Sequence, residues 1–238
     1  YCSSKNYIEK PAKYKNAKLH YIPLNANGAQ SIPYDIWSIC HAVFKRNDTI
    51  LLLGVSGAIC LPFLRLFSKT KIVTNIDGLE WRRDKWGVFA KIFLKFSEKI
   101  AVNYSDVVVA DNKGIADYVL EEYGMEAEVI AYGGDHAVIS DLNLSDEGYA
   151  LALCRIEPEN NVEMILESFS KTNKKLMFIG NWNNSDFGRQ MKAQYYKFEN
   201  IDIVSPVYEL EKLFELREKC SFYVHAHSAG GTNPSLVE

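Results

Sequence analysis

Short runs of β-branched and aliphatic residues alternate along this chain with longer amphipathic stretches. This alternation is typical of βαβ units, in which helices connect buried parallel strands. In the first half, strands are predicted at residues 18–22, 50–53, 71–75, 107–110 and 128–131, and helices at residues 33–45, 58–67, 89–104 and 115–123. Gly124 directly follows the last helical pattern and is expected to be its C-cap. The first half is therefore predicted to be an α/β domain with a parallel sheet.

A polar stretch at residues 133–148, rich in Gly, Ser, Asp and Asn, separates this series from a second one. In the second series, strands are predicted at residues 149–154, 175–179, 201–204 and 222–224, and helices at residues 162–171, 187–198 and 209–220. The pattern predicts two Rossmann-like α/β domains facing a cleft, at residues 1–138 and 139–238. Residues 1–5 resemble the end of a strand and residues 234–238 the first turn of a helix, so both domains are expected to be truncated.

The composition narrows the class of protein without changing this architecture. Of the 238 residues, 47% are hydrophobic and 24% are charged, which is typical of folded soluble proteins. The formal net charge of −3 argues against a nucleic-acid-binding protein, because such proteins carry a strong basic field. The most apolar stretch, residues 50–64, is shorter than the ~20 residues that cross a bilayer. Five cysteines without C-x-x-C spacing, and a start without a signal peptide, predict reduced thiols and a cytoplasmic protein.

The segment most informative about function is HAHSAGGTNPSLVE, residues 225–238, where a predicted strand passes into a helix. Ligands of doubly wound sheets bind at this edge, outside the carboxyl ends of the strands. Asn233 is a favourable N-cap and Pro234 suits the first helical position, so backbone amides of the first turn would face the loop. Gly230 and Gly231 would let a diphosphate approach those amides closely. The alternative is an ordinary turn between a strand and a helix.

This segment resembles the nucleotide-sugar loop of glycosyltransferase family 4, and in particular a subgroup similar to bacterial β-1,4-rhamnosyltransferases with their rhamnosyltransferase-type N-terminal domain. The run GGTNPS, followed by a Glu, carries the resemblance, which implies the GT-B fold. It also implies that Thr232, Asn233 and Ser235 belong to the donor site and that the Glu238 carboxylate accepts hydrogen bonds from the donor ribose. The first Glu of the family's E-x7-E motif is replaced here by Gly230.

The run RIEPENN, residues 155–161, follows the first strand of the second domain and resembles the family's R-x-x-x-E-K segment. The resemblance implies a forked, charge-assisted contact between Arg155 and the donor diphosphate, which would stabilise charge on the leaving nucleotide. The family's Lys is absent, and Asn160 or Asn161 stands near its place. The alternative for residues 158–160 is a plain turn at the start of a helix.

In the first domain, the run DGLEW at residues 77–81 follows a predicted strand and matches the rhamnosyltransferase-like subgroup residue for residue. Asp77 is the candidate catalytic residue that orients the acceptor hydroxyl or accepts its proton, and Glu80 is the second candidate. The alternative is a turn at residues 77–78 and a solvated carboxylate at Glu80. The runs at residues 111–115 and 131–135 also match the subgroup, so the resemblance covers nearly the whole chain.

The predicted helix at residues 89–104 is both basic and aromatic. Its apolar residues recur on one face and its lysines on another: Phe89, Phe93, Phe96 and Ile100, and Lys91, Lys95 and Lys99. Two interpretations remain open. The apolar stripe either faces the core of a Rossmann-like domain with solvated lysines opposite, or the helix leans on an anionic membrane surface that holds a lipid-linked acceptor.

Together these features predict a retaining glycosyltransferase, with domain 1–138 on the acceptor side and domain 139–238 binding the nucleotide sugar. The subgroup suggests dTDP-L-rhamnose as donor, otherwise a UDP-sugar, and a lipid-linked saccharide acceptor in bacterial surface polysaccharide synthesis, at the inner face of the cell membrane. His227 is expected either to approach the donor sugar or to pack beside the loop.

No metal and no further cofactor are expected, because the sequence has no Asp-x-Asp run and His225 lies only two residues from His227. Two competing predictions remain: a non-catalytic nucleotide-sugar-binding fragment, and another nucleotide-binding Rossmann enzyme such as an epimerase. A dehydrogenase is disfavoured, because no G-x-G-x-x-G run follows a predicted strand.

Overall fold

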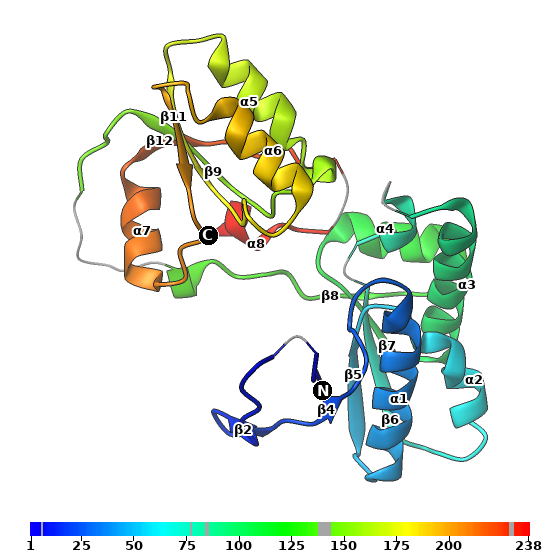
Figure 1. The fold of residues 1–238 in the computed structure, drawn as a ribbon. Coiled ribbons are helices and arrows are strands. Elements are labelled where there is room, and N and C mark those ends of the chain that lie inside the picture. The colour runs from blue at the N-terminus through cyan, green and yellow to red at the C-terminus, as the bar shows by residue number, and fades with distance from the viewer. Residues whose placement is uncertain (6, 77, 84–85, 138–143, 229–230) are drawn as a thin grey trace. The chain divides into compact units, whose positions relative to one another are not determined.

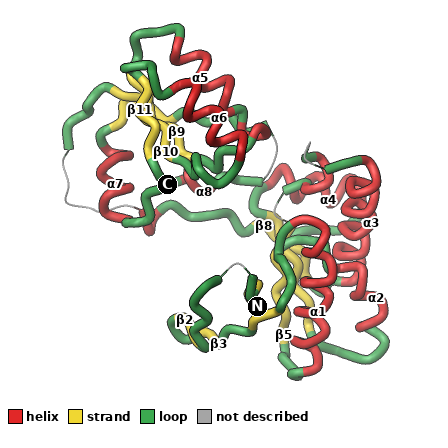
Figure 2. The backbone as a smooth tube through the Cα atoms, viewed as in Figure 1, coloured by secondary structure: helices red, strands yellow, loops and turns green. Residues whose placement is uncertain are grey.

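The computed structural model describes residues 1–238 except 6, 77, 84–85, 138–143 and 229–230 (Figure 1). The chain divides into two compact units, one of Tyr1–Arg82 and Trp86–Ala131 and the other of Arg83–Lys85 and Tyr132–Glu238. The predicted boundary between residues 138 and 139 lies outside the described residues. Each unit contains a parallel sheet with helices packed against it (Figure 2).

The first unit is built on a four-stranded parallel sheet of order β5-β6-β7-β8. Its strands are β5 Thr49–Leu53, β6 Lys71–Ile76, β7 Val107–Ala110 and β8 Glu128–Val129. Its helices are α1 Ser31–Phe44, α2 Leu61–Leu64, α3 Val88–Tyr104 and α4 Lys113–Tyr123. The core lies between these helices and one face of the sheet, where Ile50, Leu52 and Ile72 pack against Leu61 and Val102. The prediction of a parallel α/β domain is confirmed.

The predicted strand at residues 18–22 is wrong. Instead, β3 Ala17–Lys18 pairs antiparallel with β2 Lys13–Tyr14, and β4 Tyr21–Ile22 pairs with β1 Cys2–Ser3, both outside the four-stranded sheet. The physical reason is that a strand inside a parallel sheet is apolar on both faces, whereas this segment alternates with Lys and His.

The structure gives local reasons for where two of the predicted helices begin or end. The predicted helix at residues 58–67 is shorter than expected, because a 3₁₀ turn at Ala58–Cys60 precedes α2 and Pro62, which has no N–H, is tolerated only in the first helical turn. Gly124 is confirmed as the C-cap of α4, with a left-handed φ of 67°.

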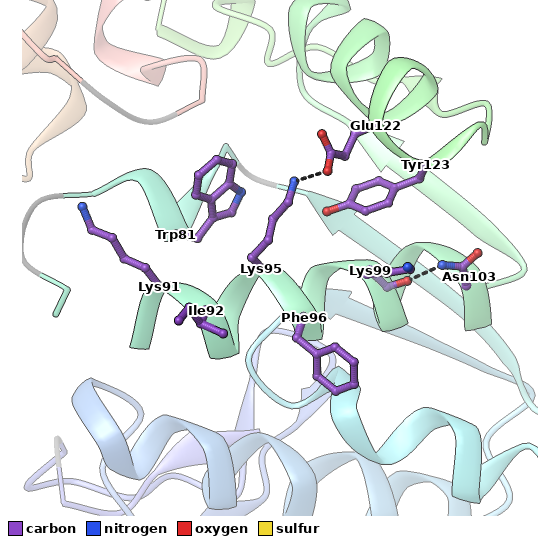
Figure 3. A pocket seen from close by; sticks show the side chains of 9 residues that line it. All are labelled: Trp81, Lys91, Ile92, Lys95, Phe96, Lys99, Asn103, Glu122 and Tyr123. Carbon is purple, nitrogen blue, oxygen red and sulfur yellow. Dashed lines mark hydrogen bonds and ion pairs between the residues drawn. The ribbon is translucent and has the colours of Figure 1, made fainter. Parts of the chain in front are cut away.

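The apolar stripe of α3 faces the core only in part, because Ile100 packs against the core, whereas Phe89 and Phe96 do not. The side of α3 that packs into the unit carries Leu94, Ala101 and Val102. Phe89 and Phe96 are exposed, and Phe93 and Ile100 are half-buried. Small and aliphatic residues let this side of the helix pack closely, and the rings of Phe89 and Phe96 lie on the outer side. Figure 3 shows the Phe96 ring pointing away from α4.

The second unit has a parallel sheet of order β11-β10-β9-β12. Its strands are β9 Tyr149–Leu153, β10 Lys175–Ile179, β11 Ile201–Val204 and β12 Cys220–Tyr223. Its helices are α5 Val162–Ser170, α6 Asp186–Tyr195, α7 Leu210–Glu218 and α8 Pro234–Val237. Every strand and helix predicted after residue 148 is therefore present, and the fold class of two Rossmann-like α/β units is confirmed.

Helices cover both faces of the second sheet, because side chains of the central strand β9 alternate between them. Ala150 and Ala152 face α5 and α6, where they pack against Leu166 and Phe178. Tyr149 and Leu151 face α7 and pack near its leucines. Across the described residues of both units, no helix is at once long and apolar enough to cross a membrane.

Candidate functional site

The candidate site lies at the carboxyl edge of the second sheet, where the strand order reverses. From β9 the chain winds outward to β10 and β11, then returns to place β12 on the other side of β9. The helix after β9 covers one face of the sheet, and the helix before β12 covers the other. Parallel sheets open a crevice at such a switch point, between the loops that follow the two strands on either side of it, here β9 and β12. Those loops hold the two runs singled out in the sequence, residues 155–161 and 225–238.

Hydrogen bonds join these two loops. The Ser228 hydroxyl donates to the Glu159 carbonyl at 2.9 Å, and the Asn161 side-chain amide donates to the Ala226 carbonyl at 2.6 Å. Asn161 has a left-handed backbone with φ of 52°, which Asn tolerates better than most residues. The structure therefore brings the predicted donor-binding segments together at one place.

Two hydrogen bonds fix the backbone around Arg155. Asn160 is buried and its side-chain amide donates to the Arg155 carbonyl at 2.7 Å. The Ile156 amide donates to the Asn181 side chain at 2.7 Å. The Arg155 side chain itself is 64% exposed, and its Nη1 lies 3.9 Å from the Glu157 carboxylate. The guanidinium is thus open to a ligand, and Asn160 acts by holding the Arg155 loop.

The turn interpretation of residues 158–160 also holds, since Pro158–Asn160 forms a 3₁₀ turn that leads into α5. This turn is where Glu159 forms an ion pair with Arg83, a residue that clusters with the second unit. Sequence reasoning missed the contribution of Arg83, because nothing near it in the sequence indicates a partner at residue 159.

His227 is paired with His225 in the loop after β12. The two imidazole rings have centroids 4.3 Å apart, with Nδ1 of His227 at 3.1 Å from Nδ1 of His225, and the Asn233 amide nitrogen lies 3.3 Å from His227 Nδ1. Burial, followed by the charges of His225 and Arg155, lowers the pKa of His227 to about 4. At neutral pH the imidazole is therefore uncharged, and it offers hydrogen bonds without adding charge.

We expect His227 to titrate near pH 4, well below the ordinary value of 6.5 for histidine. Between pH 6.5 and 4 the unfolded chain binds a proton at this histidine and the folded chain does not. The contribution of His227 to the free energy of unfolding is therefore full above pH 6.5 and is lost as the pH falls toward 4. After allowance for partial exposure, the loss from this residue between pH 6.5 and 5 is about 1 kcal/mol. NMR titration of the imidazole resonances, assigned with His227→Gln, measures it. A midpoint at the ordinary value would contradict the buried neutral imidazole.

The start of α8 has the predicted geometry. The Asn233 side-chain oxygen accepts a hydrogen bond from the Ser235 amide at 2.9 Å, and Pro234 occupies the first turn. The N-cap prediction is confirmed, and the same bond means that the Ser235 amide is already engaged. Gly231 and Thr232 are half-buried beside it, whereas Gly230 lies outside the described residues.

The Glu238 carboxylate is held by two residues that sequence reasoning did not single out. Arg217 at the end of α7 forms an ion pair with it, and Nε2 of His136 lies 3.0 Å from its Oε1. Gly134 lies against the same turn, and a Cβ there would sit 2.5 Å from the Val237 carbonyl oxygen. These contacts fix the carboxylate in place, and its contact with a donor ribose stays a prediction.

Of the two candidate catalytic residues on the first unit, the structure describes only Glu80. Asp77 lies outside the described residues. Glu80 sits in the 3₁₀ turn Glu80–Arg82, and its Oε1 accepts a hydrogen bond from the Trp86 indole at 2.9 Å. Glu80 is therefore an anchored, half-buried carboxylate and not a freely solvated one. Within the described part of both units, no group of three or more His, Cys, Asp or Glu side chains is arranged to hold a metal ion.

Comparison with solved structures identifies the fold. The chain is similar to sucrose-phosphate synthase from Thermosynechococcus elongatus, with a TM-score of 0.65, 11% identity, and coverage of 90% of this chain and 61% of that one. It is similar to S. aureus MnaA in a UDP co-structure, with a TM-score of 0.61, 11% identity, and coverage of 88% and 60%. A glycosyltransferase from Rickettsia africae gives a TM-score of 0.57, 16% identity, and coverage of 87% and 59%.

The likeness shows the GT-B fold, which glycosyltransferases and UDP-N-acetylglucosamine 2-epimerases share, and confirms that expectation. The chain spans about three fifths of the length of these proteins. A comparison with curated protein sequences gives no match. Residues 1–135, more than half of the chain, match the family described as a domain of unknown function, DUF1972. This chain belongs to the DUF1972 family.

Proposed function

We propose that this protein binds a nucleotide sugar at the carboxyl edge of its second unit and acts in sugar transfer to a saccharide acceptor. The observation that carries the proposal is the meeting of the Arg155 loop and residues 226–228 at the switch point of the sheet. An exposed guanidinium, a neutral imidazole and the start of a helix converge there.

The chemistry of a nucleotide sugar matches this set of groups. The diphosphate brings negative charge that increases as the bond to the sugar breaks, and the planar fork of Arg155 suits phosphate oxygens. His227 is neutral, so it can donate a hydrogen bond to a sugar hydroxyl or a phosphate oxygen without a second cation nearby. Asn161 joins the two loops and Asn160 fixes the Arg155 loop, which preserves the geometry before the ligand binds.

The finer proposal follows the resemblance of the sequence to family 4 rhamnosyltransferases. The donor is dTDP-L-rhamnose, otherwise a UDP-sugar, transferred with retention to a lipid-linked acceptor of surface polysaccharide at the inner face of the membrane. Asp77 and Glu80 are the candidates that orient or deprotonate the acceptor hydroxyl. Glu238 is the candidate that accepts hydrogen bonds from the donor ribose. No metal is needed if Arg155 and the amides near α8 neutralise the leaving diphosphate.

The relatives in structure support a donor of this class. One of them is described as a complex with UDP, and another, TarM from S. aureus, is described in complex with alpha-GlcNAc-glycerol and UDP at a TM-score of 0.59 and 14% identity. A second candidate function also has support, because UDP-N-acetylglucosamine 2-epimerase from Rickettsia bellii has the same fold, with a TM-score of 0.54 and 17% identity. An epimerase would bind the same class of nucleotide sugar, change the configuration of its sugar and release it, and it would need no acceptor.

A ligand screen tests the binding part of the proposal. We expect dTDP and UDP to stabilise the 238-residue chain against thermal unfolding, by about 2.7 kcal/mol at a ligand concentration of 100 Kd, and NAD to have no effect. Stabilisation by NAD and not by either nucleoside diphosphate would contradict the proposal and favour a dehydrogenase-like site.

Product analysis then separates the two candidate functions. Incubation with dTDP-L-rhamnose or a UDP-sugar, with and without a saccharide acceptor, is expected to release nucleoside diphosphate at a rate that depends on the acceptor. Conversion of the nucleotide sugar to an epimer in the absence of acceptor would identify an epimerase instead.

A further inference from the structure

The Glu238 carboxylate has a protein partner on each of its two oxygens. Arg217 forms an ion pair with Oε2, and Nε2 of His136 lies 3.0 Å from Oε1. Arg217 stands in the last turn of α7, and His136 stands in the 3₁₀ turn Asp135–Ala137. Glu238 itself directly follows α8. Three separate segments of the second unit therefore meet at this carboxylate, and two of them set its orientation.

The turn that carries His136 is packed closely against the end of α8. A Cβ on Gly134 would lie 2.5 Å from the Val237 carbonyl oxygen, which is too close for any side chain. The Gly134 carbonyl accepts a hydrogen bond from the Ala137 amide at 2.9 Å, and Ala137 is buried. His136 thus reaches Glu238 from a packed segment, although its own ring is 60% exposed.

The Glu238 carboxylate lies near the edge of the sheet that holds the candidate site. The hydroxyl of Tyr223, at the end of β12, donates to the Leu153 carbonyl at the end of β9 at 3.0 Å. Burial raises the pKa of Tyr223 to about 12, and the charges of Arg217 and Glu238 also act on its hydroxyl. Glu238 is therefore close to the carboxyl ends of the two strands that flank the switch point, the edge from which the Arg155 loop starts.

The stability of the fold is a weak reason for this ion pair. The side chains of Arg217 and Glu238 are only 13% and 16% exposed, so both lose most of their hydration in the folded chain. The attraction between two such charges roughly offsets that loss, and two apolar side chains of similar size would hold α7 against residue 238 about as well. The pair therefore calls for a task of the carboxylate besides holding these segments together.

The carboxylate keeps acceptor capacity after both contacts are made. An ionised carboxylate offers about four acceptor positions, two on each oxygen. Arg217 uses one position on Oε2 and His136 one on Oε1, and no other donor from the described part of the chain reaches either oxygen. One position on each oxygen is left, which matches the hydroxyl groups of a pentose as donors.

We infer that Arg217 and His136 are positioning residues that hold the Glu238 carboxylate for contact with the pentose hydroxyls of a nucleoside diphosphate. The inference rests on the proposed function, because it needs a nucleotide at this edge of the second unit. Each positioning residue fixes one oxygen, so the carboxylate keeps one orientation before the ligand binds. Loss of either residue lets the carboxylate rotate, which weakens its contact with the pentose and leaves the contacts with the diphosphate in place.

A pair of ligands that differ only in the pentose hydroxyls tests the inference. Calorimetry compares the affinity of the 238-residue chain for UDP and for 2′,3′-dideoxy-UDP, and for dTDP and its dideoxy form. We expect the unaltered chain to bind the hydroxylated member of a pair about tenfold more tightly or better, because a hydrogen bond to a charged acceptor is lost in the other. Equal affinity within both pairs would overturn the inference and leave the proposed function standing.

Variants of His136 then test its positioning role without disturbing a buried side chain. His136→Ala is expected to reduce the ratio between the two affinities about threefold, with the affinity for the dideoxy ligand unchanged. His136→Gln keeps a donor and is expected to restore the ratio in part. The matched control is His20→Ala, at an exposed histidine of the first unit, and it is expected to leave both affinities unchanged.

Arg217 is tested in the same way, with charge controlled. Arg217→Met is expected to reduce the ratio about tenfold, whereas Arg217→Lys keeps the charge and restores part of it. Arg189→Met removes the same charge at a 53% exposed position on α6 and is expected to leave the ratio unchanged. Circular dichroism checks that each variant is folded.

The outcomes separate this inference from the proposed function. A ratio that is unchanged in both His136→Ala and Arg217→Met, or an equal loss of affinity for both members of a pair, would overturn the positioning role. An unaltered chain that binds neither UDP nor dTDP would contradict the proposed function, and the inference would fall with it.

Discussion

Replacement of Arg155 by alanine is expected to weaken the binding of dTDP or UDP about tenfold to a hundredfold. A bidentate guanidinium–phosphate contact is charge-assisted, and such bonds contribute about 1.5–3 kcal/mol. Arg155 presents its guanidinium to solvent at the switch point, and its loop is held by Asn160 and Asn181, so the variant removes the charge and leaves the loop in place. Isothermal titration calorimetry with each nucleoside diphosphate measures the effect.

A control of similar exposure separates this site from general charge. Lys171, 68% exposed at the end of α5, pairs with Glu167 and lies away from the loops of the site. Lys171→Ala is expected to bind the nucleoside diphosphate like the unaltered chain. If Arg155→Ala binds with unchanged affinity while the protein remains folded, Arg155 is not a phosphate ligand.

Replacement of Trp182 by alanine is expected to lower the free energy of unfolding of the second unit by about 3–5 kcal/mol. Trp182 is 2% exposed, its indole nitrogen donates to the Val204 carbonyl at 2.9 Å, and its ring meets Phe178 edge-on with centroids 5.1 Å apart. The variant therefore leaves a large cavity and also removes a buried hydrogen bond. Urea unfolding followed by circular dichroism measures the change.

Trp37 provides the matched control for this stability prediction. It is 52% exposed on α1 of the first unit, so Trp37→Ala is expected to change the free energy of unfolding by no more than about 0.5 kcal/mol. A loss for Trp182→Ala as small as that of the control would mean that the ring is not packed as described.

The Trp182 variant also bears on the site, because Trp182 follows Asn181 directly in the loop after β10. Asn181 accepts the hydrogen bond that fixes Ile156 next to Arg155. A collapse around Trp182 is expected to loosen this support, so ligand affinity falls together with stability. The Arg155 variant, by contrast, lowers affinity while stability is unchanged.

The sequence by itself determined most of the local structure of this protein. The alternation of strands and helices depends on the spacing of apolar residues within a short window, and it correctly predicted the strands and α-helices that the structure describes after residue 148. The cap at Asn233 and the C-cap at Gly124 are equally local, because each satisfies backbone groups one turn away.

Only the tertiary structure decided which residues meet across long distances in the sequence. The engagement of Asn160 with Arg155, the hold of Arg217 and His136 on Glu238, and the low pKa of His227 all depend on surroundings from several elements. The orientation of α3 is of the same kind. An amphipathic pattern with two apolar sectors fits a helix in either orientation. The packing of Ala101 and Val102 in the core selects the orientation that leaves Phe89 and Phe96 exposed.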